Sequence, residues 1–312
     1  MSAAETVRVP DALDRNRELG AGWTAWLDRL PRLARELLGE WELARDGEVM
    51  HGFCSLVLPV RTAGGEPAVL KITFDGDDES EHEALMLQRA GGDGMVRLLR
   101  ASPARRALLL ERVSTRDLSS VGDTEACEVV AGLYARIHKP APPQLRTVTS
   151  YVERWVARLA ELPRDAPVPH RLVEQATSLA RDLVADPAST GVSVHGDLHH
   201  HNVLAAEREP WLVIDPKPMS GDRHYEPAPM LWSCWHRVVA SGNVRGAVRR
   251  RFHALVDVAG LDEERARDWA VVRMVVNAGW AIEDAQRAGR GLSREERDWI
   301  TRCIAIAKAV QD

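Results

Sequence analysis

Residues 194–204 read VHGDLHHHNVL, and residues 212–216 read LVIDP. The first stretch holds the carboxylate of Asp197 and the amide of Asn202, and the second ends an apolar run on the carboxylate of Asp215. Phosphoryl transfer needs a group that orients the attacking hydroxyl and accepts its proton, and oxygen ligands that hold Mg²⁺ on the phosphates. The two stretches therefore predict a phosphotransferase with Asp197 as the base and with Asn202 and Asp215 as magnesium ligands.

The same pattern has two other interpretations. A turn rich in Asp, Asn and His needs no chemistry, but it does not explain why Asp215 ends an apolar run. A zinc site would use the neutral imidazoles of the loop, which are His195, His199, His200 and His201. Three consecutive histidines cannot all face one ion without strain, and the sequence contains no HExxH motif. We expect the run at 199–201 to shape the loop or line the substrate cleft, with His199 as a substrate contact.

The chain changes from strand-rich to helix-rich along its length. Apolar alternation around the turn residues 62–66 predicts an antiparallel hairpin of residues 53–60 and 67–73, and 96–99 and 107–113 predict two further strands. Helical spacing predicts helices at 23–38 (interrupted at Pro31), 79–90, 126–138, 149–162, 170–185, 245–258, 263–287 and 294–310. Strands followed by helices favour an α+β fold with a small β-rich N-lobe, residues 1–113, and a larger helical C-lobe, residues 114–312.

Composition excludes several classes of partner. The 312 residues include 41 basic and 46 acidic side chains, a net charge of −5, so no basic excess attracts nucleic acid or an anionic membrane. The sequence contains no apolar run of membrane-spanning length and no signal-like core within Met1–Arg17, so we expect a cytoplasmic protein. The four cysteines form no CxxC pair and are expected to be reduced thiols.

The catalytic stretch resembles that of the aminoglycoside phosphotransferase family, which has a bilobal protein-kinase-like fold. Three segments are most similar to its streptomycin 6-kinase and hydroxyurea phosphotransferase branch: 202–212 (NVLAAEREPWL), 214–218 (IDPKP) and 92–99 (GDGMVRLL). The resemblance extends from about Val9 to the C-terminal helices. It implies ATP and Mg²⁺ as cofactors, Asp197 as the base, and Asn202 and Asp215 as the metal ligands. The pair at 200–201 departs from the Pro-Gly or other pair usual in related loops, and this departure bears on the acceptor more than on phosphoryl transfer.

The resemblance also assigns a nucleotide site. Lys71 matches the strand lysine that binds the α- and β-phosphates, and Glu83 is expected to pair with it, with Glu79 and Glu81 as alternatives. Ser55 is a candidate phosphate contact. The neighbouring hairpin lacks GxGxxG, and the chain has no GxxxxGK[ST] motif, so the hairpin alone is weak evidence for phosphate binding.

The run 108–113 (LLLERV) is expected to link the lobes and to present the backbone of Glu111 and Val113 to adenine.

The acceptor is expected to be a small, cationic, hydroxylated molecule. Streptomycin carries guanidinium groups, and carboxylates bind guanidinium through paired hydrogen bonds. Candidate contacts are Glu226, Glu283 and Asp284, with Trp280 as a wall.

We therefore predict an ATP-dependent O-phosphotransferase that acts on a streptomycin-type aminoglycoside and gives antibiotic resistance. The alternatives are a kinase of hydroxyurea or another small hydroxylated metabolite, and a nucleotide-binding module without turnover. The presence of the base, the strand lysine and both metal ligands disfavours the last of these.

Overall fold

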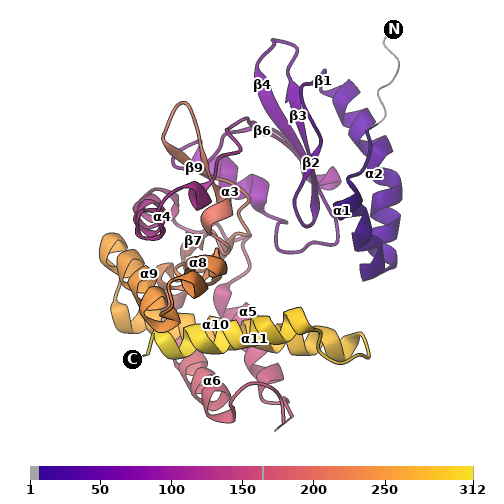
Figure 1. Cartoon of the computed structure of the whole chain (residues 1–312). Coiled ribbons are helices and arrows are strands. Elements are labelled where there is room, and N and C mark those ends of the chain that lie inside the picture. The colour runs from indigo at the N-terminus through magenta and orange to yellow at the C-terminus, as the bar shows by residue number, and fades with distance from the viewer. Residues whose placement is uncertain (1–6, 164, 312) are drawn as a thin grey trace. The chain divides into compact units, whose positions relative to one another are not determined.

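The computed structural model describes residues 7–163 and 165–311. The chain forms two compact units that divide between Ser114 and Thr115. The N-terminal unit is built on an antiparallel sheet and the C-terminal unit is mainly helical (Figure 1). This content confirms the predicted α+β class, with a small β-rich part followed by a larger helical one.

The sheet of the N-terminal unit is formed around one hairpin. Its order is β1-β3-β4-β6-β5, with β2 paired to β3. The hairpin of β3 and β4 places Val57 opposite Lys71, and Leu56, Leu58 and Val60 of β3 are buried. The strands are β1 (Ala44–Arg45), β2 (Met50–His51), β3 (Ser55–Arg61), β4 (Pro67–Thr73), β5 (Leu98–Ser102) and β6 (Ala107–Glu111).

Helix α2 (Ala21–Glu40) covers this sheet (Figure 1). Its buried face, which includes Trp26, Leu30 and Leu37, belongs to the same core as the sheet residues. Pro31 lies inside the helix, so the predicted interruption is wrong. Proline costs a helix one hydrogen bond, but here the apolar face continues on both sides of it, and packing outweighs the local loss. The other helical segments are α1 (Asp11–Asp14), η1 (Arg15–Leu19), α3 (Glu83–Ala90) and η2 (Pro103–Arg105).

The C-terminal unit is organised around α10 (Glu263–Arg287), which contacts α5, α6 and α11. An uninterrupted run from Trp269 to Gly279 is buried, as expected for a helix with neighbours on all sides. The predicted bounds of α6 and α10 are confirmed. The other helical segments are η3 (Leu118–Ser120), α4 (Asp123–Ile137), α5 (Val148–Leu159), α6 (His170–Ala185), η4 (Pro187–Ser189), η5 (His200–Asn202), η6 (Arg223–Tyr225), α7 (Ala228–Trp232), α8 (Trp235–Ala240), α9 (Val244–Ala259) and α11 (Arg294–Ala309).

Two short strand pairs carry the loops that the sequence singles out. β7 (Val192–Val194) pairs with β10 (Met219–Gly221), and β8 (Val203–Ala205) pairs with β9 (Trp211–Val213). The segment 195–202 therefore runs from β7 to β8, and the segment 214–218 runs from β9 to β10. Among residues 7–163 and 165–311, no helix has both the length and the apolar character needed to cross a bilayer.

We predict that Leu30→Ala lowers the free energy of unfolding of the N-terminal unit by about 2–5 kcal/mol, because it leaves a cavity in a packed core. Leu30 is completely buried, whereas Leu19 is 58 % exposed. Leu19→Ala is the matched control and should change stability by less than about 0.5 kcal/mol. Guanidinium denaturation of both variants measures the difference, and equal effects would contradict the packing of α2 on the sheet.

Candidate active site

The ring of His195 ties the predicted base to the end of β9. Its Nε2 lies 2.9 Å from the carbonyl oxygen of Ile214, and its Nδ1 lies 3.2 Å from the backbone nitrogen of Asp197. Burial lowers the pKa of His195, so the ring is neutral at neutral pH. Because the Asp197 N–H donates to Nδ1, the ring proton resides on Nε2 and is donated to Ile214. One buried ring thus sets the backbone position of Asp197.

Gly196 allows the segment 214–218 to pack directly on the catalytic loop. Its φ is 82°, and a Cβ at this position would lie 2.4 Å from the carbonyl oxygen of Lys217. The Lys217 N–H donates to the carbonyl oxygen of His195 at 2.8 Å. Only glycine combines this backbone conformation with such a close approach.

Buried charged groups hold the same loop from the other side. Glu226 is completely buried, and its Oε1 accepts a hydrogen bond from the Gly196 N–H at 2.8 Å. Its Oε2 lies 3.7 Å from Nε2 of His138, and Arg273 donates to the carbonyl oxygens of Gly196 and Tyr225. Burial alone would raise the pKa of Glu226, but His138 and the Gly196 N–H lower it overall, so the group is ionised. Glu226 was an expected acceptor contact; because it has no exposed surface, we propose instead that it positions the catalytic loop.

Lys217 and His199 lie close to the carboxylate of Asp197. Nζ of Lys217 is 3.3 Å from Asp197 Oδ2, and Nε2 of His199 is 3.8 Å from the same oxygen. Burial lowers the pKa of His199, so Lys217 is the cation of the two at neutral pH. Lys217 stands two residues after Asp215 in the segment IDPKP, but no pattern in the sequence predicts a role for it.

The β8–β9 pair brings the predicted metal ligands to one end of a hairpin. Val203 pairs with Val213, and the Ile214 N–H donates to the carbonyl oxygen of Asn202 at 2.9 Å. The Asn202 amide nitrogen donates to the carbonyl oxygen of Asp197 at 2.8 Å, so its amide oxygen is the atom that a hard cation would bind. Asp215 has a φ of 55°, a conformation that is uncommon outside glycine and that is concentrated at functional sites.

The three consecutive histidines face three different carboxylates. His199 approaches Asp197, His200 lies 3.8 Å from Asp123, and Nδ1 of His201 lies 2.6 Å from Asp117. Burial lowers the pKa of His200 to about 3, so this ring is neutral. Because the three rings approach three different carboxylates, they do not fit a site for one shared metal ion.

In the N-terminal unit Lys71 pairs with Glu83, the expected partner. Nζ of Lys71 lies 2.7 Å from both carboxylate oxygens, and both side chains are almost fully buried. Ser55 is buried at the start of β3, and Glu111 ends β6 with its carboxylate accepting from the Arg97 N–H. Val113 follows this strand. The roles of these residues in nucleotide binding remain predictions.

Three of the predicted acceptor residues, Trp280, Glu283 and Asp284, belong to α10, which contacts α5. The Trp280 ring packs edge-on against Tyr151 and Trp155. Oε1 of Glu283 is 2.7 Å from Arg158 on α5 and 2.8 Å from Arg287, whereas the side chain of Asp284 is 64 % exposed and pairs with Arg287. A cationic acceptor at Glu283 would therefore compete with two arginines.

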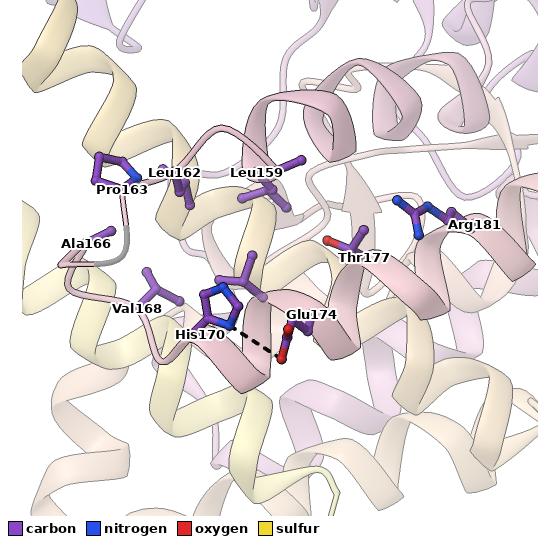
Figure 2. Close-up of a pocket in the computed structure, with 11 residues that line it drawn as sticks. Leu159, Leu162, Pro163, Ala166, Val168, His170, Glu174, Thr177 and Arg181 are labelled. Carbon is purple, nitrogen blue, oxygen red and sulfur yellow. Dashed lines mark ion pairs between the residues drawn. The ribbon is translucent and has the colours of Figure 1, made fainter.

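A cavity of about 290 Å³ lies between the end of α5 and one face of α6 (Figure 2). Leu159, Leu162 and Val168 form its apolar side, and His170 and Glu174, 3.4 Å apart, lie on its polar side. None of the predicted site residues is among the side chains that line it, so it lies outside the candidate active site.

The fold is that of protein-kinase-like small-molecule kinases. A structure of amicoumacin kinase in complex with AMP-PNP, Ca²⁺ and Ami superposes with a TM-score of 0.61 at 15 % identity, covering 93 % of this chain and 95 % of that one. The model of the family "Aminoglycoside/hydroxyurea antibiotic resistance kinase" matches residues 40–285.

Two relatives match most of the chain. Streptomycin 6-kinase from Streptomyces glaucescens is 41 % identical over 300 residues, covering 92 % of this chain and 95 % of that one. Hydroxyurea phosphotransferase from Kitasatospora aureofaciens is 39 % identical over 277 residues, covering 86 % and 78 %. The chain belongs to the aminoglycoside/hydroxyurea antibiotic resistance kinase family, and it is a phosphotransferase that acts on a hydroxyl group.

We predict that Glu226→Ala lowers the free energy of unfolding by about 1–3 kcal/mol, because it leaves the buried Gly196 N–H without an acceptor. Turnover should fall as well, since this N–H belongs to the residue before the base. Glu226→Gln keeps an acceptor oxygen and should retain more of the stability and more of the turnover than Glu226→Ala. Thermal denaturation and steady-state kinetics measure these effects, and an alanine variant as stable and active as wild type would exclude the positioning role.

Proposed function

We propose that the protein transfers the γ-phosphoryl group of ATP to a hydroxyl of a streptomycin-type aminoglycoside in the cytoplasm, with Mg²⁺ as cofactor, and so confers resistance. The observation that best supports this proposal is the arrangement of the catalytic loop. Asn202 is hydrogen-bonded to the backbone of Asp197, and the β8–β9 pair brings Asn202 and the segment that begins at Asp215 to the same end of a hairpin.

In this proposal Asp197 orients the acceptor hydroxyl and takes its proton as the oxygen attacks the γ-phosphorus. The bond from that phosphorus to the β–γ bridging oxygen breaks, and ADP leaves. Asn202 and Asp215 hold Mg²⁺, which when bound neutralises charge on the phosphate oxygens. Lys71 binds the α- and β-phosphates, and Glu83 fixes its ammonium group in the buried position that the ion pair defines.

The choice of acceptor is supported by similarity, because a streptomycin 6-kinase is 41 % identical to the chain over nearly its whole length. The carboxylates of α10 that would suit a guanidinium group pair with Arg158 and Arg287, so a cationic acceptor would have to displace them. Hydroxyurea is the second candidate, because a hydroxyurea phosphotransferase also matches at 39 % identity. ADP release measured across streptomycin, other aminoglycosides and hydroxyurea separates them. No release with any of these compounds would contradict the proposal.

We predict that Asp197→Asn lowers kcat by about 10²–10⁴-fold, the range that general-base catalysis contributes. The substitution keeps the shape of the side chain, so affinity for MgATP measured by titration calorimetry should stay close to that of wild type. Weakened nucleotide binding with normal turnover of the bound complex would contradict the assignment of Asp197 as the base.

We predict that Glu283→Gln combined with Asp284→Asn raises the KM for streptomycin at least about tenfold and leaves the KM for ATP unchanged. Each lost charge-assisted hydrogen bond weakens binding by about 1.5–3 kcal/mol, or one to two decades. The matched control is Glu295→Gln with Asp298→Asn, the same chemical change at exposed positions of α11. Equal KM values in the two double variants would show that the α10 face does not bind the acceptor.

A further inference from the structure

Lys217 forms an ion pair with the predicted base, Asp197, and this pair contributes little to the stability of the fold. Its Nζ is 3.3 Å from Asp197 Oδ2, and the two side chains are 29 % and 22 % exposed. A partly exposed ion pair of this kind contributes at most about 1 kcal/mol to stability. The pair is therefore better explained by what it does at the catalytic loop.

The backbone fixes Lys217 on both sides. Its own N–H donates to the carbonyl oxygen of His195 at 2.8 Å, and two residues later Met219 pairs with Val194 in the β10–β7 ladder. Its carbonyl oxygen lies against Gly196, where a side chain would not fit. The position of the ammonium group beside Asp197 thus follows from the same contacts that build the catalytic loop.

The transferring group must come close to this ammonium. The acceptor hydroxyl has to lie within hydrogen-bond distance of the Asp197 carboxylate, about 2.6–3.2 Å, for its proton to be taken. The γ-phosphorus bonds to that same hydroxyl oxygen in the transition state, so its non-bridging oxygens lie within a few ångströms of the carboxylate. Charge on these oxygens has to be stabilised by fixed donors or cations.

We propose that Lys217 is a catalytic residue that donates a hydrogen bond to a non-bridging oxygen of the transferring γ-phosphoryl group. This inference rests on the proposed function. Lysine suits the role because its ammonium is a compact charge with three donors, so one can stay on Asp197 while another binds the phosphoryl oxygen. His199, the other side chain beside Asp197, is neutral and supplies no such charge. The family match does not by itself assign this role to Lys217.

The test compares nucleotides that differ in the γ-phosphate. Titration calorimetry with MgADP and with Mg-AMP-PNP, a non-hydrolysable triphosphate, is carried out on wild type, Lys217→Met and Lys217→Arg. We expect Lys217→Met to lose about tenfold or more of the affinity for the triphosphate while keeping that for the diphosphate. Its kcat should fall by about 10²–10³-fold, the loss typical of one transition-state donor. Lys217→Arg keeps a cation and should retain part of the affinity for the triphosphate and part of kcat.

Lys308→Met, at an exposed position of α11, is the matched control and should change neither quantity. An unchanged ratio of triphosphate to diphosphate affinity in Lys217→Met would overturn the phosphoryl contact, even if kcat fell, since Lys217 would then act on Asp197 alone. The binding comparison needs no acceptor. If wild type phosphorylates none of the acceptors tested, the proposed function fails, while the affinities still decide whether Lys217 senses the γ-phosphate.

Discussion

The contact between the catalytic loop and the segment after β9 is the constraint on which the candidate active site depends. Three hydrogen bonds join the two segments through His195 and Asn202, and the Gly196 backbone lies directly against Lys217. Each of these contacts is made by the backbone or by a neutral buried ring. Because the two segments are fixed to one another, Asp197, Asn202 and Lys217 occupy defined positions without needing direct bonds among all their side chains. A one-residue shift of either segment would displace all of them together.

Buried charged side chains also fix the helices that surround the catalytic loop and the segment after β9. Asp222 accepts hydrogen bonds from the Trp269 indole, from the ring and backbone of His224, and from Arg265. Burial alone would raise the pKa of Asp222, but His224 and the Trp269 indole lower it to about 2. Arg251 is likewise buried and donates to both oxygens of Asp123 and to backbone carbonyl oxygens of the α7–α8 region. Removing one partner of such a group costs about 3–5 kcal/mol, so these groups hold the helices around the loop in one arrangement.

The structural features that could be predicted from the sequence are those that depend on residues close together along the chain. The bounds of α6 and α10 follow from apolar spacing. Asn202 and Asp215 were predicted together as metal ligands, and the β8–β9 pair places the segments that hold them at one end of a hairpin. Features that depend on distant neighbours were not predictable in this way. Pro31 does not break α2, because the sheet core holds the helix on both sides of it.

Glu226 shows the same limit at the candidate site. Its burial depends on the Gly196 backbone thirty residues earlier and on His138 of the segment after α4. From the sequence, an acidic side chain in a polar segment is equally compatible with a ligand contact on the surface. Glu83 was the expected partner of Lys71, but Glu79 and Glu81 stayed as alternatives, since the spacing of acidic residues before and within α3 does not determine which one faces the strand.

The three rings of the histidine run make different contacts around the catalytic loop. His201 binds Asp117 and attaches the loop to the segment before α4, whereas the neutral ring of His200 is buried beside Asp123. Only His199 turns toward Asp197. His201 therefore acts as an anchor of the loop, whereas His199 and Lys217 lie beside the predicted base. Differences in acceptor preference are then expected to arise from His199 and from the α5–α10 face rather than from His200 and His201.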